Sequence, residues 1–339
     1  MSSTSAPETL TDLQTDLINR VRQATGVTAT NTQATRYLNI ALKDMHVGFT
    51  EKLPWCHRRA TLITHPQYTT GTVTITQGST TLTGTSTVWT TTNSFGVANA
   101  RTSGKITIAG TPEVYTIASV GGAGTITLGS RYVGSDVTAG TYSYFEDEYD
   151  LASDFLRPLH QQFFDQNAAI AIMGRREFLM RYPRNSTVGT IRACSIVDLA
   201  PSGNTTPIRR IVFAPPPQEA ELIQYDYITS NLAVSSAGVA QESLSASTDE
   251  PIVPKSYRIA IVYHALYNWY RDQKDDVRAV EAKQEYTDFM LRMTSDHQIG
   301  RSTPQLRPRM GMYTKHARKP YSRSGRRHQL GTAFDEMRD

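Results

Sequence analysis

Few side chains in this 339-residue chain have the type and spacing that chemistry requires. His57 directly follows Cys56 and could share a metal with it, but two ligands do not make a zinc site. Residues 146–150 carry four carboxylates, the oxygen ligands that Ca²⁺ and Mg²⁺ prefer. We interpret the Cys-His pair as part of an ordinary loop and the acidic cluster as a solvated link.

The sequence patterns of common catalytic sites are missing. There is no H-E-x-x-H zinc pattern, no P-loop, no G-x-S-x-G elbow and no G-x-G-x-x-G turn after a strand. The eight histidines are scattered along the chain, at His46, His57, His65, His160, His264, His297, His316 and His328. We therefore predict a protein that is not an enzyme and that uses no cofactor or metal.

The most unusual composition lies in the C-terminal tail. Residues 301–328 carry nine Lys or Arg and no Asp or Glu, and residues 301–339 have a net charge of +7 against +4 for the whole chain. Such a basic arm can bind phosphate backbones, can become ordered on an acidic protein partner, or can simply be a disordered tail. The residues that we assign to binding by this arm are Arg301, Arg307, Arg309, Tyr313, Lys315, Arg318, Lys319, Tyr321, Arg323, Arg326 and Arg327.

Two amphipathic helices are expected just before this tail. Pro254 can begin a helix that runs through Arg271, and a second helix can begin near Val277 after the polar turn at 272–276. So short a link predicts antiparallel packing of the two helices. Tyrosine and tryptophan at helical spacing are commonly core residues, but they also favour interfaces. We assign an inter-subunit face to Tyr257, Tyr263, Tyr267, Trp269 and Tyr270.

Helices and strands also divide the rest of the chain. Amphipathic patterns predict one helix from Leu10 to Gln23 and another from an N-cap at Thr32 to an end at 53–55. Between Tyr68 and Phe145 the composition changes to Thr, Gly, Ser and Val, and alternation predicts an antiparallel β domain. Its expected strands lie at 72–76, 105–108, 114–117 and 125–128, with a glycine-rich hairpin turn at 121–124.

The stretch from 146 to 250 has a mixed pattern. A short helix is expected at Arg175–Arg181, strands at 208–213 and 220–228, and a linker or long loop at 231–250. Only two cysteines are present, which favours a reducing compartment or no disulfide. The N-terminus lacks the pattern of a signal peptide, and no run of 18 apolar residues indicates a membrane span.

The order of these parts resembles the head-to-tail adaptor, or connector, proteins of tailed bacteriophages. Arg36–Ala41 reads R-Y-L-N-I-A, which is similar to the R-Y-L-N-x-A motif of that family. The two expected C-terminal helices look like the long helices of such adaptors, on the residues Pro254, Tyr257, Tyr263, His264, Ala265, Leu266, Tyr267, Ala279, Ala282, Tyr286 and Met293. Residues 71–89 resemble β modules that phage structural proteins insert into this scaffold. The resemblance covers 8–60 and 250–298 well and 150–235 loosely.

The resemblance implies an α+β fold with a helical adaptor core. That core would consist of an N-terminal helix pair and a C-terminal antiparallel helix pair, with an inserted small antiparallel β domain and an extended basic C-terminal arm. The expected boundaries are 1–67 for the N-terminal helices, 68–146 for the β domain, 147–250 for a mixed part of the core, 251–300 for the helical hairpin and 301–339 for the arm.

The resemblance also implies a function and a location. The chain would be a virion structural protein of the phage neck, made in the host cytoplasm, that forms a twelve-fold ring beneath the portal. The ring would extend the DNA channel and join capsid to tail, with the arm on the portal. Its partners would be the portal ring, tail or further neck proteins, other copies of itself and the passing genomic DNA, with no membrane.

Two other function classes remain open at this point. The chain could be a DNA-binding virion or packaging protein that acts through its basic tail. It could instead carry a carbohydrate- or receptor-binding module on the β insert, where Trp89, Tyr115 and Tyr132 could stack on sugars.

Overall fold

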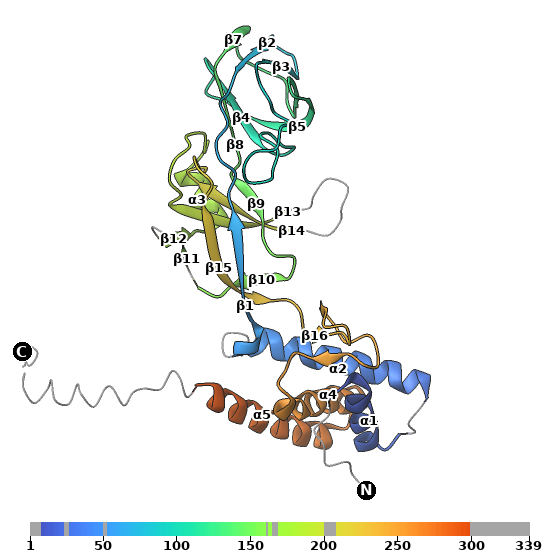
Figure 1. Ribbon diagram of the computed structural model, residues 1–339. Helices are drawn as coiled ribbons and strands as arrows, with labels where there is room; N and C mark the ends of the chain where they lie inside the picture. Colours follow the sequence, from blue (N-terminus) through green and yellow to red (C-terminus); the bar gives the residue numbers. More distant parts are fainter. Residues whose placement is uncertain are drawn as a thin grey trace, which may run out of the picture. The chain divides into compact units, whose positions relative to one another are not determined.

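The computed structural model describes residues 8–23, 27–49, 53–160, 162–164, 169–199 and 208–298 (Figure 1). The chain divides into two compact units. The helical unit contains the described residues up to Trp55 and from Asn231 onward, and the β unit contains those from Cys56 to Ser230. The helical unit is therefore built from two ends of the chain that are far apart in sequence.

Four helices dominate the helical unit: α1 (Leu10–Val21), α2 (Thr28–Phe49), α4 (Ile259–Asp272) and α5 (Asp276–Gln298). α1 begins at a capping box, in which the Thr9 hydroxyl accepts from the Asp12 amide and the Asp12 carboxylate accepts from the Thr9 amide. α4 and α5 pack on each other, and α4 also packs on α1 and α2. Their shared core includes the buried side chains of Leu13, Leu17, Leu38, Ala41, Ala265, Trp269 and Met293.

Three shorter pieces complete the helical unit. A 3-10 turn, η3 (Lys255–Tyr257), leads into α4. The strands β16 (Ala233–Val234), β17 (Ala240–Gln241) and β18 (Glu250–Pro251) form a small antiparallel sheet, where a linker was expected. The predicted N-cap at Thr32 is wrong, since α2 already begins at Thr28 and the Thr32 hydroxyl donates to the Thr28 carbonyl at 2.9 Å.

The β unit contains an eight-stranded sheet whose path runs β1-β15-β11-β12-β13-β14-β9, with β10 also paired to β15. Its pairings are antiparallel except for β12 with β13. Parallel neighbours need a crossover connection, and the helix α3 (Arg175–Arg181) lies in that connection. The strands are β1 (His57–Ile63), β9 (Glu148–Asp150), β10 (Phe155–Pro158), β11 (Gln162–Phe164), β12 (Ala169–Ile172), β13 (Ala193–Leu199), β14 (Ile208–Ala214) and β15 (Leu222–Thr229).

A second, seven-stranded sheet lies between β1 and β9 in the sequence and curls into a half-barrel (Figure 1). Buried and exposed side chains alternate along its strands, so threonines such as Thr74 face outward while Val73 and Ile75 face a core around Trp89. In sheet order the strands are β7 (Val137–Gly140), β2 (Thr72–Ile75), β3 (Thr81–Thr85), β6 (Thr125–Leu128), β5 (Val114–Gly122), β4 (Lys105–Ile108) and β8 (Tyr142–Phe145).

The fold class predicted from the sequence is wrong. The described residues form five α-helices and the strands β1 to β18. The molecule is therefore β-rich and not a helical adaptor core with a small β insert. The β unit spans residues 56–230 and joins the expected insert at 68–146 with much of the stretch expected to be mixed core. The missed strands β9 to β12 are only three or four residues long, too short to show a clear alternation of apolar and polar side chains.

Several local predictions are confirmed. β4 and β6 occupy 105–108 and 125–128 as expected, and β5 and β6 are paired neighbours on either side of the glycine-rich turn. α3 has the predicted bounds, and α5 begins one residue before Val277. Each of these segments has a strong local signal, either strict alternation or an amphipathic repeat.

Gly104 permits the close packing of the Tyr144 ring inside the half-barrel. A Cβ atom at Gly104 would lie 2.7 Å from Cζ of Tyr144. We expect Gly104→Ala to lower the free energy of unfolding by about 1–3 kcal/mol, the usual cost of overpacking a core. Gly122→Ala is the matched control, because a Cβ there meets nothing within 4 Å, and it should change stability by less than about 1 kcal/mol. Urea unfolding of the two full-length variants would measure this difference, and equal stabilities would contradict the packing argument.

Candidate functional site

The R-Y-L-N-I-A motif lies on α2 and binds the C-terminal segment of the helical unit. The Tyr37 hydroxyl donates to the Asp272 carboxylate at 2.6 Å, and the Tyr37 ring lies 5.1 Å from the Trp269 ring. Burial and this hydrogen bond raise the pKa of Tyr37, so the hydroxyl keeps its proton as a donor. Tyr37 therefore fastens α2 to the last turn of α4.

Asn39 makes a second connection from the same motif. Its Nδ2 donates to the Leu244 carbonyl at 2.9 Å, and its Oδ1 accepts from the Leu244 amide at 2.9 Å. Both backbone groups of one buried residue are thus paired by a single side chain. Arg36, in contrast, is exposed. The motif consequently contains two residues that stabilise the helical unit and one that is available to a partner.

The aromatic residues predicted to face another subunit divide into two groups. Trp269 and Tyr270 are buried within the helical unit itself, so the prediction of an inter-subunit role is wrong for these two. Tyr257, Tyr263 and Tyr267 are half-buried. Tyr257 lies on η3, and Tyr263 and Tyr267 lie on α4, so part of each of these side chains reaches the surface of the unit.

The half-buried tyrosines already have contacts within the unit. Tyr257 donates to Asp296, and the Tyr263 ring stacks on Phe289 with centroids 5.6 Å apart. The Arg20 guanidinium lies 4.9 Å from the Tyr263 centroid. Cation–π and stacking contacts of this kind fix the rings in place. Any inter-subunit contact would therefore use their outer edges.

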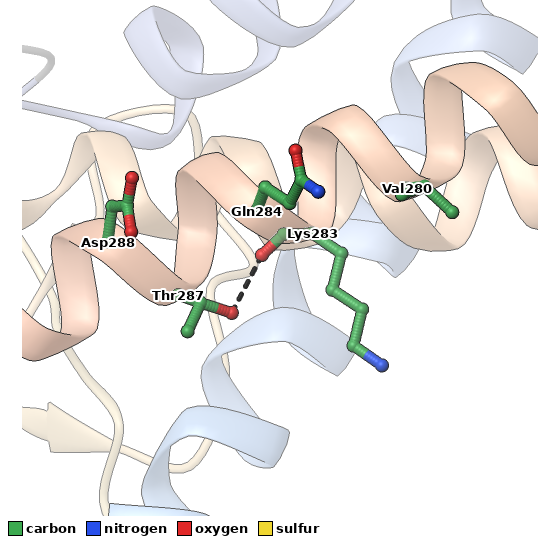
Figure 2. Close-up of a pocket in the computed structure, with 5 residues that line it drawn as sticks. All are labelled: Val280, Lys283, Gln284, Thr287 and Asp288. Atoms are coloured by element: carbon green, nitrogen blue, oxygen red, sulfur yellow. Dashed lines mark hydrogen bonds between the residues drawn. The ribbon is translucent and has the colours of Figure 1, made fainter.

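The outer face of α5 carries apolar side chains. Val277, Val280 and Leu291 are 71%, 54% and 62% exposed, whereas Ala279 and Met290 point into the unit. A pocket of about 280 Å³ lies on this helix. Figure 2 shows the residues that line it, with the Thr287 hydroxyl donating to the Lys283 carbonyl. The pocket is lined by Val280, Lys283, Gln284, Thr287 and Asp288. A face of this kind is typical of protein contact rather than of a small-molecule site, because one helix supplies all of its walls.

Residues 301–327, which include every residue assigned to the basic arm, lie outside the described residues. The three β-insert aromatics expected to stack on sugars are described and are buried. Trp89, Tyr115 and Tyr132 are 0%, 3% and 1% exposed, and Trp89 Nε1 donates to the Tyr142 hydroxyl at 3.0 Å. Because no ring face is open, the sugar-stacking prediction for these residues is wrong.

The acidic segment at 146–150 is not a solvated link. Glu146 and Asp147 are 7% and 2% exposed. Arg101 forms a two-pronged ion pair with Glu146, which also accepts a hydrogen bond from the Tyr144 hydroxyl. Such bidentate guanidinium–carboxylate pairs are among the strongest hydrogen-bonded contacts in proteins. Sequence reasoning missed this contact because the partners lie 45 residues apart.

Asp147 forms the second half of this buried junction. It accepts from Lys105 Nζ at 2.7 Å and from Asn185 Nδ2 at 3.1 Å. Burial raises the pKa of Asp147, although the Lys105 charge opposes that rise. The Asp147 carbonyl also accepts from the Phe213 amide at 2.8 Å. The junction thus links the seven-stranded sheet, through Lys105 on β4, to β14 of the eight-stranded sheet.

The two cysteines are poorly placed for nucleophilic chemistry. Cys56 and Cys194 are buried and in no disulfide, and burial raises the pKa of each to about 12, far from the thiolate that nucleophilic chemistry needs. Within the described ranges, no group of three or more His, Cys, Asp or Glu side chains could hold a metal ion. The helices that the structure describes include none long and apolar enough to cross a membrane.

Neither a protein-family model nor a curated protein matches this sequence. Function must therefore be inferred from the residues and their geometry.

Asn39 should be important for stability, whereas its motif neighbour Arg36 should not. Asn39→Ala leaves the Leu244 amide and carbonyl without partners, so we expect the free energy of unfolding to fall by about 1–3 kcal/mol. Arg36→Ala removes an exposed side chain and should change it by less than about 0.5 kcal/mol. Thermal and urea unfolding of both variants would test this, and equal effects would contradict the assignment.

The buried junction predicts strong coupling between Lys105 and Asp147. Lys105→Met leaves a buried carboxylate without its closest cation and should cost about 3 kcal/mol. Adding Asp147→Asn removes the unpaired charge, so the double variant should recover more than half of that loss. A double-mutant cycle measured by urea unfolding would show this coupling. Additive effects of the two substitutions would mean that the ion pair contributes little.

Proposed function

We propose that this protein is a structural component of a tailed-phage virion, a head-to-tail adaptor that forms a ring beneath the portal. One observation carries the proposal. The two stretches that resemble adaptors, 8–60 and 250–298, belong to one helical unit except for residues 56–60, which are part of the β unit that separates them in sequence. Tyr37 and Asn39 of the R-Y-L-N-I-A motif make contacts that hold this unit together.

The proposed mechanism is assembly through many weak contacts. Closed rings bring identical surfaces together at every subunit, and a preformed portal ring would present as many docking positions. Contacts that are individually modest then gain strength through effective concentration. The exposed apolar face of α5 and the outer edges of Tyr257, Tyr263 and Tyr267 are surfaces suited to neighbouring subunits. The basic arm at 301–339 would bind the portal.

A structural role also fits the chemistry of the chain. Its thiols are buried, its most strongly interacting carboxylates are paired with Arg101 and Lys105, and none of these groups is free to act on a substrate. We accordingly propose that the protein acts without catalysis or a cofactor. It would work in the neck of the virion, between the portal and the tail or further neck proteins, with genomic DNA passing through the ring.

Removing the arm should separate folding from assembly. We expect a chain that ends at residue 300 to unfold at the same temperature as the full chain but to fail to co-sediment with purified portal rings. The reason is that the arm would supply the portal contact while the helical unit supplies the fold.

A matched control replaces residues 301–339 by a Gly/Ser chain of equal length, which keeps the length but not the charge. Co-sedimentation of the truncated protein at full strength would contradict the portal-binding arm. Negative-stain images of the full chain mixed with portal rings would test the ring itself, and the absence of any added ring would contradict the adaptor function.

A further inference from the structure

The helix α3 lies firmly on the eight-stranded sheet. Phe178 is 2% exposed and packs in a small cluster with Val212 and Ala214 of β14. The Tyr182 ring lies 5.5 Å from the Phe178 ring, and the Tyr182 amide donates to the Phe178 carbonyl at 2.8 Å. The helix is thus fixed on the sheet through its buried side.

The chain after α3 is fastened as well. Asn185 Nδ2 donates to the Phe213 carbonyl at 2.7 Å and to the Asp147 carboxylate at 3.1 Å. These two bonds tie the residue next to Arg184 to the buried junction. The segment 174–184 is therefore a supported surface element, and its exposed side chains project from a rigid backbone.

Four arginines cover this element, and we call them the arginine patch: Arg175, Arg176, Arg181 and Arg184. All four are exposed, and none forms an ion pair or side-chain hydrogen bond with another described residue. The segment has a single carboxylate, Glu177, which likewise has no ion pair there. The charge of the patch is therefore largely uncompensated.

Three arginines on strands of the eight-stranded sheet have carboxylate partners. Arg59 pairs with Asp226 at 2.8 Å, Arg209 with Asp198 at 3.1 Å, and Arg210 with Asp150 at 2.6 Å. Arg59 has 69% of its side chain exposed and still has a carboxylate partner. Exposure alone thus does not explain why the arginines of the patch are unpaired.

Two apolar side chains, Leu179 and Met180, are exposed beside the arginines. Singly exposed apolar residues are common on soluble proteins, and two of them do not make an extended apolar patch. Four unpaired guanidinium groups within ten residues are the more unusual feature. The partner should therefore be one recognised by charge and by the planar fork of arginine, which matches phosphate oxygens.

From this geometry we infer that the arginine patch is a binding site for the phosphate backbone of nucleic acid, with duplex DNA as the ligand. The site uses neither the basic arm nor the helical unit, and it does not depend on the adaptor function. Because arginine contacts to phosphates carry no base information, the site binds without sequence preference. Contact releases counterions, so binding weakens steeply with salt.

The test compares DNA affinity of full-length variants over a range of salt concentrations, using a 30-base-pair duplex of mixed sequence and fluorescence anisotropy. Neutralising the patch with R175Q, R176Q, R181Q and R184Q together should lower affinity at least tenfold at about 0.1 M salt. It should also reduce the slope of log K against log salt by roughly 3 to 4, since each phosphate contact contributes about 0.9. A slope equal to that of the unchanged chain would overturn the inference.

Two controls keep the result specific. R59Q together with R209Q removes two ion-paired arginines from the same unit and should leave the slope unchanged; an equal loss of slope per charge would overturn the assignment to the patch. The four Arg→Lys changes keep the charge and should keep the slope. Thermal unfolding should be unaffected, because the four side chains form no ion pair or hydrogen bond with other described residues. A patch variant that retains DNA binding but no longer binds portal rings would overturn the inference in favour of an acidic protein surface.

Discussion

The antiparallel ladder between β1 and β15 is the constraint on which the rest of the structure depends. Its first pair joins His57 to Ile228, so the point where the chain enters the β unit lies beside the point where it leaves. Figure 1 shows the two strands side by side. An insertion whose ends are close together can be accommodated in one loop of a host fold. The helical unit can therefore form from two segments that the whole β unit separates in sequence.

Inside the β unit, ion pairs rather than a strand ladder join the half-barrel to the eight-stranded sheet. The half-barrel departs after β1 and returns at β9, and the residues at that return are Glu146 and Asp147. Two buried carboxylates are costly unless they are paired, and breaking such pairs is strongly destabilising. Their partners Arg101 and Lys105 come from within the half-barrel, while Asn185 and the Phe213 backbone come from the other sheet. The junction thus specifies one packing of the two sheets, because any other would leave charges unpaired.

Local sequence patterns predicted individual helices and strands, but they could not predict which residues distant in sequence pair with one another. β4 could be predicted from the alternation of Lys105–Ile108, and α3 from seven residues of helical composition. β9 could not, because three residues that include two acids resemble a polar loop until β14 is known to lie beside them. The same limit applies to the sites: the acidic segment was visible, but its burial depends on Arg101, which is distant in sequence. Trp89 was visible as an aromatic residue, and only the curled sheet shows that it is core.

In each candidate surface, stability and recognition depend on different residues of one short segment. In the motif on α2, Tyr37 and Asn39 stabilise the unit while Arg36 is exposed. On α3, Phe178 anchors the helix while the arginines are unpaired. A residue already paired inside the fold gains little by contacting a partner, since it would first have to give up its own contact. An exposed charge without an ion pair has no contact to give up before it binds. This difference favours the arginine patch as the inferred binding site.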